Sequence, residues 1–472
     1  MNQYKRLASN TIIFAIGSFG SKILLLFLTK LYTANLNPGD MSTKDLLEQT
    51  ANFLIPIISC SITDAIIRYG LDRMHNRRKV FSTAYAIFGM GLIVLFASIP
   101  LLKKLPYTDG FIPLLLFYVI ASSMRSINSQ FVRARGMVKL FACDGIFATL
   151  TLFIFNLIFV GIFNLGITGF MLSVICSDFI SALMLWVIAD LRKFFSRKYI
   201  DRRMMKMMFK FSLPLIPTTI LWLVTEMSDR LFLRYMDGPS GLVGDSAAGI
   251  YGISTKLPNL ISTISTVFYQ AWNMSAILEN NSKNRSNFYK KVFSAYQSFL
   301  FIAGAFLIVF VKPLSNMLID STNYPEYAQA YKYTPILIIA VIMMCLNQFF
   351  GSIYSATQHT SHSFWTSLVS AVVNILLNIV LIKQFGIIGA VIATFASYFS
   401  SYIIRVYDAR KYVPFYVDHT RFVLNLLALF FMSFVVVNEP KGHIPMLVIS
   451  SLFVLLYNFK YIMITLLRLK RR

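Results

Sequence analysis

Charged residues are scarce in this sequence of 472 residues, and acidic residues are the scarcest of them. Only 14% of the residues are charged, whereas about a quarter is typical of a soluble domain. Together with the 57% of hydrophobic residues, this scarcity excludes an ordinary water-soluble protein. The polar residues lie in short segments between apolar runs, so no large soluble catalytic domain fits into the chain.

Cysteine is also rare, and its spacing excludes two kinds of site. Cys60, Cys143, Cys176 and Cys345 each lie in an apolar stretch, and no C-x-x-C pair is present. The spacing therefore indicates neither a disulfide framework nor a zinc site. We expect the four cysteines to be small buried apolar side chains.

Apolar runs of membrane-spanning length recur along the whole chain. A helix of about 20 residues crosses about 30 Å of hydrocarbon, and runs without alternation favour helices over a transmembrane barrel. The first run is too long for a signal-peptide core and lacks an A-x-A site, so we expect a retained span. We predict an all-α polytopic membrane protein with about fourteen transmembrane helices, at residues 7–33, 46–69, 80–102, 111–132, 140–163, 167–189, 211–236, 247–277, 289–311, 333–354, 363–382, 387–405, 422–437 and 444–463.

The basic residues predict the orientation of these spans. With the N-terminus inside, 28 of the 44 Lys and Arg residues fall in inner segments, and the outer loops hold 7, Lys44 among them. Because Lys and Arg accumulate in cytoplasmic loops, both termini are predicted to be cytoplasmic. The net charge of +24 therefore indicates anionic membrane lipids as partners, and not nucleic acid.

A weak internal repeat predicts the domain organisation. Residues 164–181 align with residues 384–401 at an offset of 220, and the identities include Gly166/Gly386 and Gly169/Gly389. Parallel repeats of this kind are common in secondary transporters. We expect two six-helix lobes related by a parallel pseudo-repeat, at 1–190 and 211–410, joined by a basic amphipathic cytoplasmic linker at 191–210. Two further helices and a basic tail would follow at 411–472.

Several charged residues fall inside predicted spans, where each charge costs at least about 2.5–3.5 kcal/mol on insertion scales. Such side chains usually face a cavity or a partner. In the four spans where two lobes would meet, bases outnumber acids six to three, which favours a cationic cavity for a phosphate or diphosphate. The candidate substrate-binding residues are Lys22, Lys30, Arg68, Arg230, Arg234 and Lys256.

The intramembrane acids are candidates for a different role. A buried carboxyl can exchange a proton as a cavity alternates between the two sides of the membrane. Structural pairing, such as Arg125 with Asp178 or Glu226 with Arg230, is the competing interpretation. The candidates for coupling ion or charge partner are Asp64, Asp178, Glu226, Asp229 and Arg125. No catalytic or metal-ligating set and no cofactor is expected, apart from a coupling proton or sodium ion.

Four segments in one order give the chain a family resemblance. They are SITDAIIRYGLDR at 61–73, RARGMVKLF at 133–141, AAGIYGISTKLPNL at 247–260 and YPEYAQAYKYTPILII at 324–339. With the predicted spans, the chain resembles the polysaccharide-transporter branch of the multidrug/oligosaccharidyl-lipid/polysaccharide exporter superfamily. This branch includes flippases of the O-antigen type.

The resemblance implies a non-enzymatic function in the bacterial plasma membrane. It implies that a polyprenyl-diphosphate-linked oligosaccharide is flipped to the outer leaflet by alternating access, for surface polysaccharide biosynthesis. Other membrane proteins of polysaccharide assembly are further candidate partners. Two alternatives remain: a cation-coupled multidrug exporter of the same superfamily, which would favour an acidic cavity, and a membrane polysaccharide polymerase, which usually needs a larger outer loop than 312–332.

Overall fold

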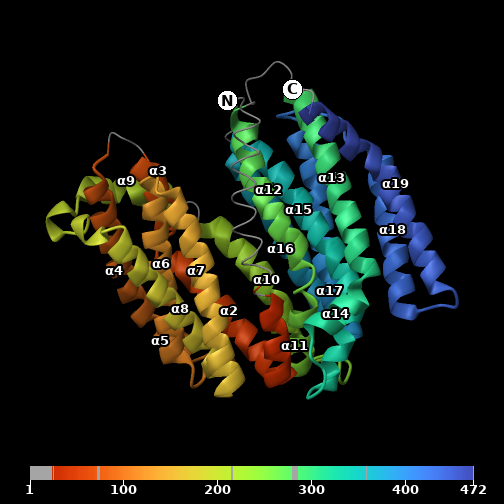
Figure 1. Cartoon of the computed structure of the whole chain (residues 1–472), viewed down its shortest axis with the longest axis horizontal. Coiled ribbons are helices and arrows are strands. Elements are labelled where there is room, and N and C mark those ends of the chain that lie inside the picture. Colours follow the sequence, from red (N-terminus) through yellow and green to blue (C-terminus); the bar gives the residue numbers. More distant parts are fainter. Residues whose placement is uncertain are drawn as a thin grey trace. The chain divides into compact units, whose positions relative to one another are not determined.

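The computed structural model describes residues 24, 26–71, 75–213, 216–278, 285–357 and 359–470, and within these ranges it contains helices and no strand (Figure 1). The described residues form two compact units. The first unit ends at Met227 and the second begins at Ser228, within helix α10 (Ile216–Tyr235). Each unit has its own interior.

The first unit is a bundle in which α6 and α8 have the most extensive contact and α7 packs on α8. Its elements are α2 (Pro38–Ile58), α3 (Ile62–Leu71), α4 (Arg77–Ala97), α5 (Ile99–Leu102), η1 (Pro106–Thr108), α6 (Ile112–Ala134), α7 (Val138–Asn156), η2 (Leu157–Ile162), α8 (Gly166–Ile188), η3 (Leu191–Lys193), η4 (Arg197–Tyr199) and α9 (Arg202–Ser212).

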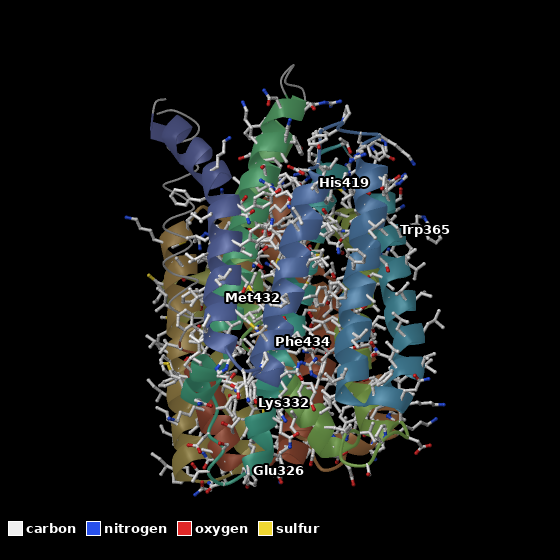
Figure 2. The ribbon with its side chains drawn as sticks, turned by 90° about the vertical axis from the view of Figure 1, so that its right-hand side faces the viewer. Glu326, Lys332, Trp365, His419, Met432 and Phe434 are labelled. Atoms are coloured by element: carbon white, nitrogen blue, oxygen red, sulfur yellow. The ribbon has the colours of Figure 1, made fainter. Side chains whose placement is uncertain are left out.

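The second unit repeats this arrangement, with α15 and α16 both packed on α17. Its elements are α11 (Asp245–Ser254), α12 (Asn259–Leu278), α13 (Arg285–Val309), α14 (Val311–Leu318), η6 (Pro325–Lys332), α15 (Thr334–Ala356), α16 (Thr360–Phe385), α17 (Ile387–Ala409), α18 (His419–Asn438) and α19 (His443–Lys470). Figure 2 shows Glu326 and Lys332 near one end of this unit and His419 near the other.

The helices confirm a polytopic membrane protein. In the described part of the chain, nine helices are long and apolar enough to cross a membrane, and the bent pair α2 and α3 would be a tenth. Each predicted span from 46–69 onward coincides with one helix or two consecutive helices, including α10, whose four charged residues make it too polar for that criterion. The predicted span 7–33 lies mostly outside the described residues.

The predicted repeat has a structural counterpart in two pairs of glycines. Gly166 is the first residue of α8, and Gly386 directly precedes α17. Their φ angles are 57° and 58°, a region that L side chains rarely adopt. A Cβ at Gly169 would lie 2.9 Å from the carbonyl oxygen of Phe159, and one at Gly389 would lie 2.2 Å from that of Leu381. In each unit the glycine therefore lets a helix approach the backbone of the helix before it.

Within the predicted linker, the structure has the short 3₁₀ turns η3 and η4, followed by helix α9 from Arg202. Two local predictions were wrong. Lys44 lies in α2 and not in a loop. Its side chain is buried, and its Nζ lies 3.2 Å from Asp45 Oδ1 and 2.7 Å from Glu48 Oε2. Of the cysteines, Cys345 is buried and Cys143 is exposed, because α7 buries few of its side chains.

Candidate functional site

Asp229 of α10 is the most densely hydrogen-bonded carboxylate of the second unit. Its side chain is 3% exposed. Asn374 and Asn378 of α16 donate to Oδ1 at 3.0 and 2.6 Å. Tyr251 of α11 and Thr394 of α17 donate to Oδ2 at 2.6 and 2.7 Å. Four helices therefore converge on one acidic group, and we call these five residues the Asp229 cluster.

The chemistry of the Asp229 cluster suits a small cation or a proton. The four donors are neutral amide and hydroxyl groups, and each also has an oxygen that can accept or coordinate. If the amides turn and the hydroxyls rotate, the same side chains present oxygen atoms, the ligands that hard cations prefer. No group of three or more His, Cys, Asp or Glu side chains in the described part of the chain could hold a metal ion.

A second polar cluster lies inside the first unit, on α6, α7 and α8. Arg125 Nη1 lies 3.0 Å from Asp178 Oδ1, and Arg125 Nε lies 3.6 Å from Asp144 Oδ2. Ser122 donates to Asp178, and Ser181 donates to Asp144. One guanidinium thus serves two buried carboxylates, so these charges hold three helices together. We call these five residues the Arg125 cluster.

The structure separates the six candidate substrate-binding cations by their environments. Lys22 lies outside the described residues, and Lys30 is exposed. Arg68 is exposed, with its guanidinium 5.0 Å from the ring centroid of Phe211.

The three cations of the second unit also differ. Arg230 is buried beside Asp229 in the chain, at 8% exposure. Arg234 Nε forms an ion pair with Asp245 Oδ1 at 2.9 Å. Lys256 is half-buried in the turn between α11 and α12. Arg230 is therefore the most buried of the candidate cations that the structure describes.

The remaining candidate acids, Asp64 and Glu226, are both exposed. Asp64 lies in the first turn of α3, just after the break at Cys60 and Ser61, which both have positive φ angles. Neither acid belongs to the Asp229 or the Arg125 cluster. Of the candidate acids, Asp229 and Asp178 are thus the ones that belong to these two polar clusters.

Sequence reasoning missed several members of these clusters. Asp144 lies on a different helix from Arg125 and 19 residues after it, so no sequence spacing marked it as a partner of Arg125. Asn374 and Asn378 are spaced i, i+4 within a long apolar helix, and this spacing on one face was the available signal.

The sequence analysis also missed Arg405 of α17, which is 2% exposed. Its guanidinium donates to Thr366 Oγ1 at 2.9 Å, to the Asn347 carbonyl oxygen at 2.8 Å and to Ser367 Oγ at 2.9 Å. These neutral acceptors on α15 and α16 satisfy the buried charge, so Arg405 joins three helices of the second unit.

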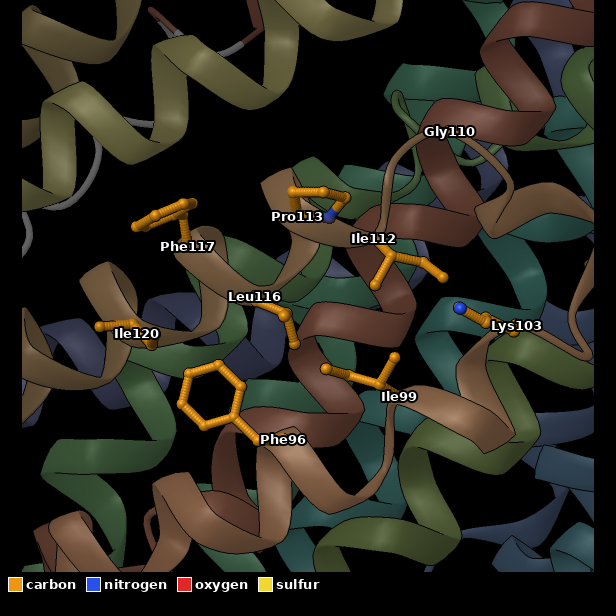
Figure 3. A pocket seen from close by; sticks show the side chains of 9 residues that line it. All are labelled: Phe96, Ile99, Lys103, Gly110, Ile112, Pro113, Leu116, Phe117 and Ile120. Atoms are coloured by element: carbon orange, nitrogen blue, oxygen red, sulfur yellow. The ribbon is translucent and has the colours of Figure 1, made fainter.

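An apolar pocket of about 460 Å³ lies in the first unit, between α4–α5 and α6. Figure 3 shows Phe96, Leu116 and Phe117 along it, with Lys103 as its one charged side chain. This lining fits a hydrocarbon chain and offers almost nothing to a sugar. The pocket therefore does not suit a polar head group.

Comparison with solved structures identifies the fold. A multidrug resistance MATE family transporter of the MOP superfamily, in an inward-facing conformation, has a TM-score of 0.66 at 11% identity, over 84% of this chain and 98% of that one. The lipid II flippase MurJ in an inward closed conformation also has a TM-score of 0.66, at 16% identity, over 95% of this chain and 98% of MurJ. The chain therefore has the fold of these two-lobe transporters.

Sequence comparison identifies the family. An uncharacterized membrane protein of Methanocaldococcus jannaschii is 23% identical over 293 residues, which are 59% of this chain and 55% of that relative, so the match spans about half its length. The MatE family model matches residues 214–380. The model of the polysaccharide biosynthesis protein family matches residues 7–272, more than half of the chain. The chain thus belongs to the polysaccharide biosynthesis protein family, as the resemblance of its sequence motifs led us to expect.

Proposed function

We propose that this protein flips a polyprenyl-diphosphate-linked oligosaccharide from the cytoplasmic to the outer leaflet of the plasma membrane. The observation that supports this most is the match of a polysaccharide biosynthesis family to more than half of the chain. A sugar head with a diphosphate cannot cross hydrocarbon unaided, because each desolvated hydroxyl and charge is costly. Two lobes that open alternately to the two sides would shelter the head, while the polyprenyl tail stays in lipid.

The diphosphate requires cationic side chains, and the six candidate cations supply them. Arg230 is the first choice among the described residues, because it is buried in a span rich in charged groups. Arginine binds phosphate oxygens through two parallel N–H donors, which a lysine cannot do. Lys22 is the second choice, because its place in the middle of the first predicted span leaves it little means of reaching water.

Asp229 is our candidate for the coupling group. Its hydrogen-bond donors are neutral groups that can turn away from the carboxylate, so a proton or sodium ion can replace them without breaking a salt bridge. Asp178 is less suited, since the ion pair with Arg125 already neutralises it. One elementary charge that moves down 100 mV supplies about 2.3 kcal/mol. Coupling through Asp229 would use that energy to reset the two lobes.

A multidrug exporter is the second candidate function, because the MatE family model matches residues 214–380. The two functions differ in the charge of the transported molecule. Organic cations call for acidic and aromatic binding groups, whereas lipid diphosphates call for basic ones.

Arg230→Ala and Lys22→Ala test the flippase proposal in cells. Each should abolish export of the surface glycan while the protein remains in the membrane. Lys441→Ala, which removes an exposed lysine between α18 and α19, is the control and should leave export unchanged. Normal export in both test variants would eliminate the cationic-site hypothesis.

A further inference from the structure

A pocket of about 690 Å³ opens at one end of the second unit, where three spanning helices have their termini. Helix α13 begins there at Arg285, α17 ends at Ala409 and α18 begins at His419, the residue at the upper end in Figure 2. All three helices are long and apolar enough to cross a membrane. The pocket therefore lies at the level where a span leaves the hydrocarbon.

Basic and polar side chains line this pocket. Its donors are Ser286, Asn287, Lys290, Arg410 and His419, and no Asp or Glu is among the described residues that line it. The nearest acids along the chain have other partners. Asp408 accepts from Lys411 at 3.0 Å, and Asp418 caps α18 by accepting from the backbone N–H of Arg421 at 3.0 Å. The positive charge of Lys290 and Arg410 is thus not balanced by a carboxylate among the described residues that line the pocket.

Arg410 has a donor left over inside this pocket. Its Nη2 lies 2.8 Å from His419 Nε2, an arrangement that needs the neutral form of the histidine as acceptor. Its Nε is buried and has no hydrogen-bond partner among the residues that the structure describes. A buried N–H without an acceptor costs about 1–3 kcal/mol, more when it is charged. No described acid is paired with this guanidinium, and an anion in the pocket would balance its charge.

Exposed aromatic rings beside these cations indicate a membrane lipid. Tyr407 is 62% exposed and Tyr416 is 64% exposed, and their rings lie 5.6 Å from Arg410 Cζ and 5.1 Å from Lys290 Nζ. Tyrosine with Lys and Arg is typical of the head-group layer, where a ring can cover the glycerol region while the cation meets the phosphate.

We propose that this pocket, formed by Lys290, Arg410, His419 and Tyr416, binds the phosphate head group of an anionic phospholipid. The bound lipid would fix the 410–418 turn between α17 and α18 against the start of α13, where Ser286 donates to the Pro414 carbonyl oxygen. The proposal concerns a lipid that stays bound and is not transported, so it can be tested independently of the flippase activity.

The test titrates delipidated full-length protein in detergent with phosphatidylglycerol, and counts bound lipid by native mass spectrometry. Lys290→Gln/Arg410→Gln is the test variant. Lys291→Gln/Lys441→Gln is the matched control, because it removes two charges at exposed positions outside the pocket. We expect the test variant to bind the lipid about tenfold more weakly and the control to bind it within about twofold of the native protein. Equal binding by the two variants would overturn the proposal.

Two further measurements distinguish a lipid head group from free inorganic phosphate as the ligand of the pocket. The phosphate of phosphatidylcholine is balanced by the choline cation, so the head group has no net charge, and we expect this lipid to bind far more weakly than phosphatidylglycerol. Inorganic phosphate at the same concentration should not displace the lipid, because it gains nothing from Tyr416. Full displacement by inorganic phosphate would contradict a lipid site, and equal binding of the two lipids would contradict a site for an anionic lipid. If the double variant does not fold, Lys290→Gln alone decides the question, because this side chain is exposed.

Discussion

Asn378 donates its side-chain amide to Asp229 across 2.6 Å, and this bond joins α16 to α10 inside the second unit. The same carboxylate accepts from Tyr251 and Thr394 on two other helices. Four helices that share one acidic acceptor respond together when that acceptor changes its charge. This is why we propose the Asp229 cluster as the place where binding of a proton or sodium ion would be coupled to helix movement.

Asp229→Asn should separate stability from coupling. The amide keeps the shape of the side chain but brings an N–H group against donors, so we expect stability to fall by about 1–3 kcal/mol. Transport by the variant should no longer respond to a proton or sodium gradient. Thermal unfolding and transport in vesicles with imposed gradients measure the two effects. The control is Asp245→Asn, the same change at an exposed carboxylate, which should retain the gradient response.

Arg125→Ala should destabilise the first unit. Without the guanidinium, Asp144 and Asp178 stay buried with no opposite charge nearby, and breaking a buried pair typically costs about 3–5 kcal/mol. Asp178→Asn in the Arg125→Ala background should restore part of that loss, because it removes one uncompensated charge. A double-mutant cycle on the unfolding midpoint measures the coupling. Additive effects of the two substitutions would contradict the described pairing.

Gly389→Ala tests the structural repeat in the second unit. The new Cβ would lie 2.2 Å from the Leu381 carbonyl oxygen, so α16 and α17 must separate, at a cost of about 1–3 kcal/mol. Gly145→Ala is the matched control, since nothing lies within 4 Å of its Cβ and it is also inside a helix. Unfolding curves of the two variants should diverge. A control as unstable as Gly389→Ala would show that the helix contact is not the cause.

Asp201 should hold the linker helix α9 to α4 in a pH-dependent way. Its carboxylate caps α9 at Arg203 N and Met204 N, and Lys79 donates to it at 2.6 Å. The hydrogen bond from Lys79, followed by those from the backbone, holds the pKa of Asp201 below its usual range. Because the folded pKa is depressed, the stabilisation is present above the usual pKa near 3.8 and is lost as pH falls below it.

Hydrogen exchange of residues 202–208 measures this attachment. Asp201→Asn keeps a good helix cap but loses the ion pair, whereas Asp201→Ala loses both. We therefore expect exchange of the α9 backbone to be slowest in the native protein, intermediate in Asp201→Asn and fastest in Asp201→Ala. Identical exchange in all three proteins would exclude Asp201 as the anchor.

The sequence predicted the helices better than the polar clusters. Apolar runs locate spans because hydrocarbon leaves the backbone few other choices, and nearly every predicted run coincides with a helix. Gly166 and Gly386 also revealed the repeat, because positive φ angles strongly favour glycine. The break between α2 and α3 at Cys60 was not predicted, although Pro56 in the last turn of α2 was the available signal, because a proline inside an apolar run does not by itself fix where a helix ends.

The members of each cluster could not be predicted, because partners on different helices have no fixed spacing in sequence. Asp144 and Arg125 are close in space because α6 and α7 pack against each other and against the same helix, α8. Asn374 and Asn378 are uncharged, so counting charges could not find them. The two candidate acids that the structure leaves exposed, Asp64 and Glu226, show the reverse problem: a charge in an apolar run does not by itself mark a buried site.

Reconstitution of the purified protein in vesicles tests the central claim most directly. Vesicles with a fluorescent polyprenyl-diphosphate oligosaccharide in one leaflet would report flipping by accessibility to an impermeant quencher, with a fluorescent organic cation as the alternative substrate. Our account predicts that the native protein moves the lipid-linked sugar, that Arg230→Ala does not, and that neither moves the organic cation. Transport of the organic cation without movement of the lipid-linked sugar would contradict the account and favour a multidrug exporter.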